Sequence, residues 1–268
     1  MITDWDDAYN NRKYSTDVDE RVSNWNAEAA AFRSEHPNSE LAVAYGGHER
    51  ERIDFFYPKD EPAGLAFFVH GGYWRSFDNS SWSHLARGPL AKGWAVAMPS
   101  YRLAPDVGIH QITEAIRRAL TVAGLKVSGS IRLAGHSAGG HLVSRMLCAD
   151  IELPVEIEER IERTVSISGV HDLRPLLKTL MNDDFKMDLA DAAAESPALL
   201  APRPGVQIAC AVGSNERPEF IRQNALLANV WTGLGARTSE HQLPGYDHFT
   251  IVETLEDPKS ELCGILLA

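Results

Sequence analysis

One stretch of sequence decides the fold of this chain, IRLAGHSAGGHLV at residues 131–143. Its first four residues form a short, mostly apolar run that predicts a buried strand, and residues 138–148 have the apolar spacing of a helix. Between the two lies Gly135-His136-Ser137-Ala138-Gly139, which fits the pattern G-x-S-x-G. A serine in a strained strand-to-helix turn of this kind holds its hydroxyl in the open at the carboxyl end of the sheet. The stretch therefore predicts Ser137 as a nucleophile.

The rest of the chain repeats this order of strand and helix. Apolar or alternating runs predict strands at 41–45, 53–57, 65–69, 94–98, 131–134, 164–168, 206–212 and 237–242, of which the first two are antiparallel edge strands. Helical spacing predicts helices at 17–33, 81–92, 111–123, 138–148 and 219–231, and from His248 onward. Such alternation implies right-handed crossovers and a mostly parallel central sheet flanked by helices. With the G-x-S-x-G turn, it predicts a single α/β-hydrolase domain over residues 1–268.

Two segments depart from the alternation. Residues 1–40 predict a helical N-terminal extension, because Val22, Trp25, Ala29 and Phe32 form an apolar stripe that needs a surface to cover. Residues 172–204 hold short helical pieces and a proline-rich stretch. An insertion there is expected to sit above the strand ends as a cap.

The composition argues against several classes of protein. With 37 acidic and 26 basic residues the formal net charge is −11, which disfavours nucleic acids and anionic membranes as partners. The three cysteines lack a C-x-x-C pair, and the ten histidines lack H-E-x-x-H spacing, so we expect no disulfide, metal or cofactor. The first residues lack signal-peptide features, which predicts a cytoplasmic protein. The expected partner is a small-molecule substrate, with a homodimer as an open option.

His248 is the predicted general base. In this fold the serine comes first along the chain, then an acid, then the histidine. His248 stands in a loop that follows the strand predicted at 237–242 and opens the last helix. His241 lies inside that strand, and His171 lies too early in the chain. His248 is therefore preferred.

The acid is expected in the loop 213–219, directly after the strand predicted at 206–212. Glu216 lies in the middle of that loop and is free to point at the histidine. Glu219 is expected to begin a helix, where the N-terminal dipole favours a carboxylate. Asp247 adjoins the base, but adjacent side chains usually point apart. Glu216 is preferred, and Asp247 and Glu219 remain alternatives.

A second glycine-containing motif, His70-Gly71-Gly72-Tyr73-Trp74, follows the buried strand at 65–69. It corresponds to the segment that donates half of an oxyanion hole in this fold, and it predicts the amides of Gly72 and Tyr73, together with that of Ala138, as the donors. A plain Gly-Gly turn is the alternative. Tyr73 and Trp74 are also predicted to bind an aromatic substrate by stacking, with packing beneath the cap as the alternative for both.

Several motifs together resemble the kynurenine formamidase (arylformamidase) branch of α/β-hydrolase serine esterases. They are HGGYW at 70–74, YRLAP at 101–105, GHSAGGH at 135–141 and ERPEF at 216–220 with Gln223. The resemblance spans nearly the whole chain, although the elbow and the HGG segment are shared with many esterases. In that branch the acid is usually an aspartate, so Glu216 departs from the pattern.

The resemblance implies hydrolysis of a small amide or ester through an acyl-enzyme. The implied substrate is an aryl formamide such as N-formyl-L-kynurenine, which would give kynurenine and formate. Two other readings stay open: a general short-chain carboxylesterase, and a catalytically inactive binding protein on the same fold.

Overall fold

Six parallel strands run through the molecule and end at a common edge. A computed structural model describes residues 2–268, and over these residues one eight-stranded sheet has the order β1-β2-β4-β3-β5-β6-β7-β8. β1 pairs with β2, and β2 with β4, in antiparallel fashion, whereas every pairing from β4 to β8 is parallel. The strands are β1 Ser39–Ala44, β2 Arg52–Phe56, β3 Gly64–Val69, β4 Ala95–Pro99, β5 Ser130–His136, β6 Ile161–Ile167, β7 Gln207–Gly213 and β8 Arg237–Leu243.

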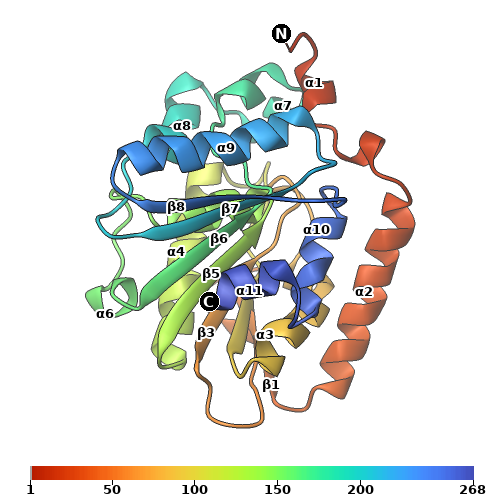
Figure 1. Ribbon diagram of the computed structural model, residues 1–268, viewed down its shortest axis with the longest axis vertical. Helices are drawn as coiled ribbons and strands as arrows, with labels where there is room; N and C mark the ends of the chain where they lie inside the picture. The colour runs from red at the N-terminus through yellow and green to blue at the C-terminus, as the bar shows by residue number, and fades with distance from the viewer. Residues whose placement is uncertain (1) are drawn as a thin grey trace.

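Helices cover both faces of the sheet (Figure 1). The α-helices are α1 Trp5–Ala8, α2 Val18–Glu35, α3 Arg87–Ala91, α4 Ile109–Lys126, α5 Ala138–Arg145, α6 Val155–Glu158, α7 Asn182–Phe185, α8 Leu189–Ala194, α9 Pro218–Gly233, α10 Thr250–Glu253 and α11 Glu261–Leu267. Short 3-10 helices lie between them, η1 Arg12–Tyr14, η2 Asn79–Ser81, η3 Ser83–Ala86, η4 Arg174–Lys178, η5 Pro197–Leu199 and η6 Thr254–Glu256.

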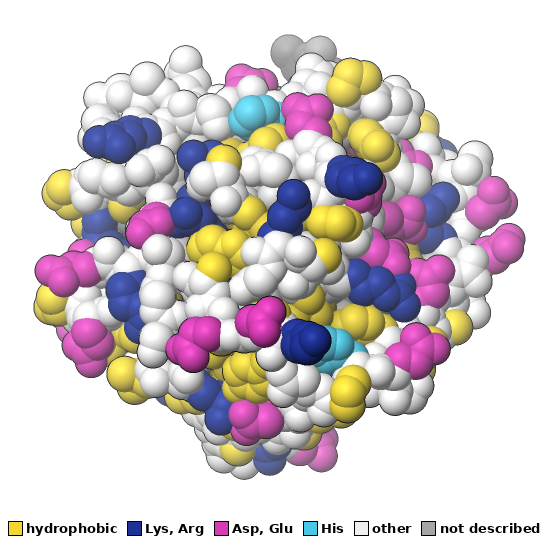
Figure 2. All heavy atoms as spheres, turned by 60° about the horizontal axis from the view of Figure 1, so that its bottom comes forward, with side chains coloured by type: hydrophobic (Ala, Val, Ile, Leu, Met, Phe, Trp, Pro, Cys, Tyr) yellow, Lys and Arg dark blue, Asp and Glu magenta, His cyan; other side chains and the backbone are white. Residues whose placement is uncertain are grey.

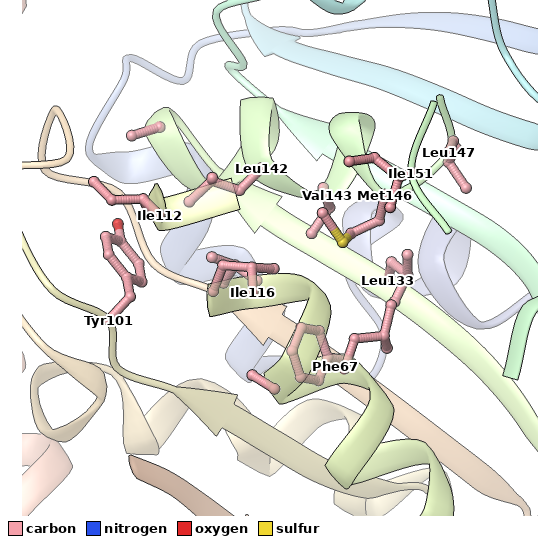
Figure 3. Close-up of a cluster of buried hydrophobic side chains, with 14 of the residues drawn as sticks. Phe67, Tyr101, Ile112, Ile116, Leu133, Leu142, Val143, Met146, Leu147 and Ile151 are labelled. Atoms are coloured by element: carbon pink, nitrogen blue, oxygen red, sulfur yellow. The ribbon is translucent and has the colours of Figure 1, made fainter. Parts of the chain in front are cut away.

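The two faces of the sheet bury separate hydrophobic cores. Successive side chains of a strand point to opposite faces: in β3, Leu65 and Phe67 enter the first core, whereas Ala66 and Phe68 enter the second. Figure 3 shows the first core, where apolar side chains of α4 and α5 pack over Phe67 of β3 and Leu133 of β5. The second core lies beneath α2, α3, α10 and α11. Burial on both faces explains why the central strands are almost continuously apolar.

The predicted α/β-hydrolase architecture is confirmed, but two of the predicted helices are wrong in extent. The helix expected at 81–92 is η3 followed by the short α3, because Pro89 lacks an amide and fits only the first turn of a helix. The helix expected from His248 onward is divided into α10, η6 and α11. Pro258 explains that break, since it holds Asp257 in an extended conformation.

Helix α2 lies along one side of the molecule (Figure 1). Trp25 and Phe32 on its inner stripe enter the second core, where the Trp25 ring lies 4.8 Å from that of Trp82. Between β6 and β7, residues 172–204 form η4, α7, α8 and η5. This insertion packs beside α9, whose Trp231 indole donates to the carbonyl of Pro197 at 3.0 Å.

On the face seen in Figure 2, acidic and basic side chains are interspersed. Among residues 2–268, no helix has both the length and the apolar character that a bilayer span requires.

The parallel strands bring several loops to one edge of the sheet, because the carboxyl ends of such strands lie together. Gly72 follows β3, Ser137 follows β5, Ser168 follows β6, Glu216 follows β7 and His248 follows β8. This edge is where the candidate site lies.

Candidate active site

Ser137 occupies a sharp turn between β5 and α5, with φ 55° and ψ −116°. Strain of this kind persists only where the surroundings enforce it. Here a Cβ at position 135 would lie 2.1 Å from the carbonyl oxygen of Gly139, and one at position 139 would lie 2.0 Å from that of Val69. The Ser137 amide also donates to the carbonyl of Ile167 in β6 at 2.8 Å. The two glycines of the motif are therefore required by close packing.

Glu216 and His248 form a buried pair. The Nδ1 atom of His248 lies 2.7 Å from Oε2 of Glu216. The other carboxylate oxygen, Oε1, accepts from the amide of Gly213 at 2.8 Å and from the hydroxyl of Ser168 at 2.5 Å. Two donors thus hold the carboxylate in place and leave one oxygen for the imidazole.

The two alternative acids do not contact His248. Asp247 accepts from the amides of Phe249 and Thr250, each at 2.9 Å, and so stabilises the start of α10. Glu219 accepts from the hydroxyl of Tyr9 at 2.9 Å and pairs with Arg222. Of the three candidates, only the preferred Glu216 is brought to the histidine.

His136 links the serine turn to His248. Its Nε2 lies 2.8 Å from the carbonyl oxygen of His248. Burial, together with the neighbouring His248, holds the pKa of His136 well below its ordinary value. A neutral ring facing a carbonyl must carry its proton on that nitrogen, so His136 donates through Nε2. This bond ties the residue before Ser137 to the backbone of the predicted base.

The HGGYW segment packs directly against the serine turn. A Cβ at Gly71 would meet the carbonyl oxygen of His136 at 2.8 Å and the Ser137 Cβ at 3.0 Å. Gly72 (φ 107°) and Tyr73 (φ 49°) turn the chain, and the carbonyl of Gly72 accepts from the amides of Arg75 and Ser76, each at 3.0 Å. Within the described residues the Tyr73 amide has no acceptor, and Ala138 begins α5, where amides have no partner in the helix. Gly72, Tyr73 and Ala138 therefore lie in the two loops that meet at the serine turn, and their role as oxyanion donors stays a prediction.

Trp74 is not a substrate contact, contrary to the prediction. Its side chain is fully buried and packs edge-on against His141 and against Phe185 of the insertion, at ring distances of 5.1 and 5.6 Å. Trp74 does not line the cavity beside Ser137, whereas the adjacent Tyr73 does. The alternative, packing beneath the insertion, is the one observed. Tyr73 does face the site, but its hydroxyl donates to the carbonyl of Tyr9 at 2.5 Å.

A cavity of about 300 Å³ opens beside Ser137 and His248. Its walls come from the HGGYW and serine loops, from Trp82 and Phe249, and from the N-terminal segment, including Tyr9, Asn10, Asn11, Arg12, Val18, Val22 and Trp25. In the described part of the chain, no residue of 172–204 lines it. The cap expected from that insertion is therefore supplied by the N-terminal segment instead. Sequence reasoning missed Tyr9 and Asn11, whose only signal was their position before the apolar stripe of α2.

One group of potential metal ligands lies outside this cavity. Atoms of Glu28, His84 and Glu256 lie within 4.8 Å of one another on the side covered by α2. Arg87 already pairs with Glu256 there, so an arginine supplies the positive charge.

Buried histidines predict a steep loss of stability in acid. Burial lowers the pKa of His70, His84 and His141 to about 4 and that of His171 to about 3. Unfolded histidines titrate near pH 6.5, so between about pH 6.5 and 4 the unfolded chain binds more protons than the folded chain. Stability is fully present above pH 6.5 and should fall by about 1 kcal/mol per pH unit for each histidine below it.

Urea unfolding followed by tryptophan fluorescence at pH 7.5, 6.5 and 5.5 measures this loss. The midpoint should fall sharply between the last two values. Replacing the half-buried His241 of β8 with Gln should leave this pH dependence unchanged. A midpoint that does not move between pH 7.5 and 5.5 would contradict the expectation.

The fold and the site together define the class of protein. A sheet of order β1-β2-β4-β3-β5-β6-β7-β8, with a serine turn after β5, an acid after β7 and a histidine after β8, is an α/β-hydrolase.

Comparison with known proteins places the chain more narrowly. No family model matches it. It is 30% identical over 236 residues to the kynurenine formamidase of Danio rerio, covering 85% of this chain and 80% of that protein. The kynurenine formamidase of Drosophila melanogaster is 29% identical over 235 residues, covering 82% and 78%. The chain belongs to the kynurenine formamidase family and is a hydrolase of the α/β-hydrolase type.

Solved structures show the same fold. A protein from a Silicibacter species, described as a candidate thioesterase, is 45% identical with a TM-score of 0.94 over 100% of both chains. A thermostable carboxylesterase cloned from a metagenomic library is 18% identical, with a TM-score of 0.68 over 93% of this chain and 98% of that one. The second likeness concerns the fold alone.

Proposed function

We propose that this hydrolase uses Ser137 to cleave an aryl formamide such as N-formyl-L-kynurenine, giving kynurenine and formate. The observation that carries the proposal is the buried Glu216–His248 pair, at 2.7 Å, beside a cavity that Ser137 and His248 both line. Membership in the kynurenine formamidase family supports the choice of substrate.

In the proposed reaction, the Ser137 hydroxyl oxygen attacks the formyl carbon while Nε2 of His248 takes its proton. A serine hydroxyl is a weak nucleophile until a base activates it in this way. Glu216 accepts from Nδ1–H of the same ring, which selects the tautomer whose Nε2 is free to act. The carboxylate also stabilises the imidazolium that forms. The tetrahedral intermediate then collapses as His248 returns the proton to the departing aniline nitrogen.

The oxyanion of the intermediate is assigned to the amides of Gly72, Tyr73 and Ala138. Each donor of this kind contributes about 3 kcal/mol to the transition state, because it is oriented before charge develops. A water molecule, deprotonated by His248, then attacks the formyl-serine. Formate leaves as the proton returns to the serine oxygen.

The walls of the cavity support an aromatic leaving group. Trp25, Tyr73, Phe77, Trp82 and Phe249 all line it, and aromatic faces pack well against an aryl ring. A volume of about 300 Å³ lies at the small end of ligand pockets, which suits a compact substrate.

The proposal is tested by comparing kcat/KM for N-formyl-L-kynurenine and p-nitrophenyl acetate. We expect turnover of the formamide, with Ser137 labelled by a fluorophosphonate probe. Fast ester cleavage without formamide cleavage would instead identify a short-chain carboxylesterase. Absence of labelling and of both activities in folded protein would identify a binding protein on a hydrolase fold.

We also propose that the protein acts in the cytoplasm. Within the described residues Cys148, Cys210 and Cys263 are all free and buried. Burial raises the pKa of the Cys148 and Cys210 thiols to about 12, so they are unreactive. Unpaired cysteines are typical of a reducing compartment. A homodimer stays a prediction.

A further inference from the structure

The N-terminal segment crosses the carboxyl edge of the sheet between α1 and α2 (Figure 1). Residues on either side of Asn11 fasten it to the domain. Asp7 pairs with Arg217 at 2.5 Å, and the same guanidinium lies 3.7 Å from the centre of the Tyr14 ring. The segment is therefore anchored both before and after the residues that face the cavity.

Tyr9 provides a second, buried anchor. Its hydroxyl donates to Glu219 at 2.9 Å and accepts from Gln223 at 3.1 Å. Its carbonyl accepts from the hydroxyl of Tyr73, a residue of the HGGYW segment. This bond couples the N-terminal segment directly to the loop that is assigned to the oxyanion hole.

Asn11 lies two residues beyond this anchor, and its backbone is fully engaged. Its amide donates to the carbonyl of Tyr9 at 3.1 Å, and its carbonyl accepts from the amide of Tyr14 at 3.0 Å. Because the amide and the carbonyl of Asn11 are both hydrogen-bonded, the backbone is held in place and the side chain leaves it in a defined direction. The side chain lines the cavity that contains Ser137 and His248.

The carboxamide of Asn11 has no hydrogen-bond partner among residues 2–268. The residue is only 4% exposed, and both Oδ1 and Nδ2 are buried and unpaired. Leaving such groups unpaired is costly, because burial removes their bonds to water without replacement. A buried polar side chain that lines a ligand cavity is therefore positioned to bond a polar group of the ligand.

The charged residues nearby are already engaged. Arg12 and Arg75 line the same cavity, but Arg12 pairs with Asp19 at 2.7 Å and Arg75 with Asp184 at 2.5 Å. Trp82 Nε1 and His136 Nδ1 also line the cavity without a partner in the described residues, but within the N-terminal segment the unsatisfied capacity is that of the Asn11 amide, which offers donors and an acceptor without net charge.

We propose that Asn11 determines specificity by bonding a neutral polar substituent, such as a ketone, on the aromatic leaving group. This inference rests on the proposed function, since it assigns the leaving-group half of the same site. In this proposal the serine and HGGYW loops bind the scissile carbonyl, and the N-terminal segment binds the leaving group.

Two formamides test the proposal: N-formyl-L-kynurenine, which carries an aryl ketone, and formanilide, which carries no ring substituent. Asn11→Leu keeps a similar side-chain size and removes both polar atoms. It should lower kcat/KM about 10- to 100-fold for the ketone substrate and leave formanilide within about 3-fold. Asn224 is the matched control, because its carboxamide is also buried and unpaired but does not line the cavity. Asn224→Leu should leave the ratio of the two substrates unchanged.

A measurement on the unaltered protein covers the case in which Asn11→Leu does not fold. 2′-Aminoacetophenone and 2-ethylaniline have similar shapes and differ in the ketone, and the first should inhibit at least about 10-fold more tightly. Equal inhibition by both amines would overturn the proposal. Equal loss of activity on both formamides in Asn11→Leu, or no loss on either, would also overturn it.

Failure of the proposed formamidase function gives a different result from failure of the Asn11 proposal. If the unaltered protein hydrolyses esters but neither formamide, the formamidase assignment fails. The same comparison is then made with 2-acetylphenyl acetate and phenyl acetate, and the same selective loss is expected in Asn11→Leu.

Discussion

Ser137→Ala is expected to lower kcat for N-formyl-L-kynurenine by about 10⁴- to 10⁶-fold, since removal of the nucleophile eliminates the acyl-enzyme route. The fold should survive the change. The elbow geometry is set by the two glycines and by the Ser137 amide bond to Ile167, none of which involves the hydroxyl. Steady-state kinetics and loss of fluorophosphonate labelling measure the effect.

A second buried serine provides the control. The Ser144 hydroxyl donates to the carbonyl of Gly140 within α5 at 2.8 Å, and Ser144 does not line the cavity. Ser144→Ala should therefore keep activity within a few-fold. Undiminished formamide turnover by pure Ser137→Ala would remove the serine mechanism altogether.

Glu216→Gln is expected to lower kcat by about 10³- to 10⁴-fold, although it alters only one polar atom. Oε1 accepts from Gly213 and Ser168, so the amide oxygen of the glutamine must take that place. The NH₂ group then faces Nδ1 of His248 and forces that atom to act as an acceptor. The ring proton moves to Nε2, the position that must be free to deprotonate Ser137.

Asp247→Asn is the matched control for this change. It removes a carboxylate from the residue adjacent to His248, and an asparagine can still accept from the amides at the start of α10. Its activity should stay within a few-fold of the unaltered protein. If Asp247→Asn were the more damaging of the two, the acid would have to be reassigned. Glu216→Asp should recover part of the activity, because it restores the carboxylate.

The side chain length of Glu216 has a structural explanation. The residue closes a turn, in which its amide donates to the carbonyl of Gly213 at 3.2 Å and its carboxylate returns to the Gly213 amide. A carboxylate that folds back over its own turn and also reaches His248 benefits from the extra methylene. This accounts for a glutamate where the resemblance leads one to expect an aspartate.

Among residues 2–268, the N-terminal segment, and not the insertion between β6 and β7, borders the cavity beside Ser137. The insertion between β6 and β7 buries Trp74 but contributes no described residue to the cavity, whereas residues 9–25 form a wall of it. We therefore expect the preference for one leaving group over another to depend on residues 9–25, which lie far from Ser137 in the chain.

The local sequence alone determined the strands, most of the helices and the serine turn. These features depend on the spacing of apolar residues and on glycines at 135 and 139, where a side chain has no room. The order of serine, acid and histidine along the chain indicated Glu216 as the preferred acid, but it left Asp247 and Glu219 open until the contact between Glu216 and His248 was seen. Residues close in sequence carry such information because strand, turn and helix are set within a few residues of one another.

Only the tertiary structure decided which distant residues share the cavity. Nothing near Asn11 in the sequence indicates that it faces a site formed around residues 72, 137 and 248, because that placement depends on side-chain bonds from Tyr9 and Asp7 to α9 and the loop before it. Trp74 shows the converse, since its place in the HGGYW segment predicted a substrate contact, whereas its side chain is fully buried against His141 and Phe185. Packing and hydrogen bonds between distant residues decide whether a side chain faces the cavity or the core. The residues next to it in the sequence do not determine this.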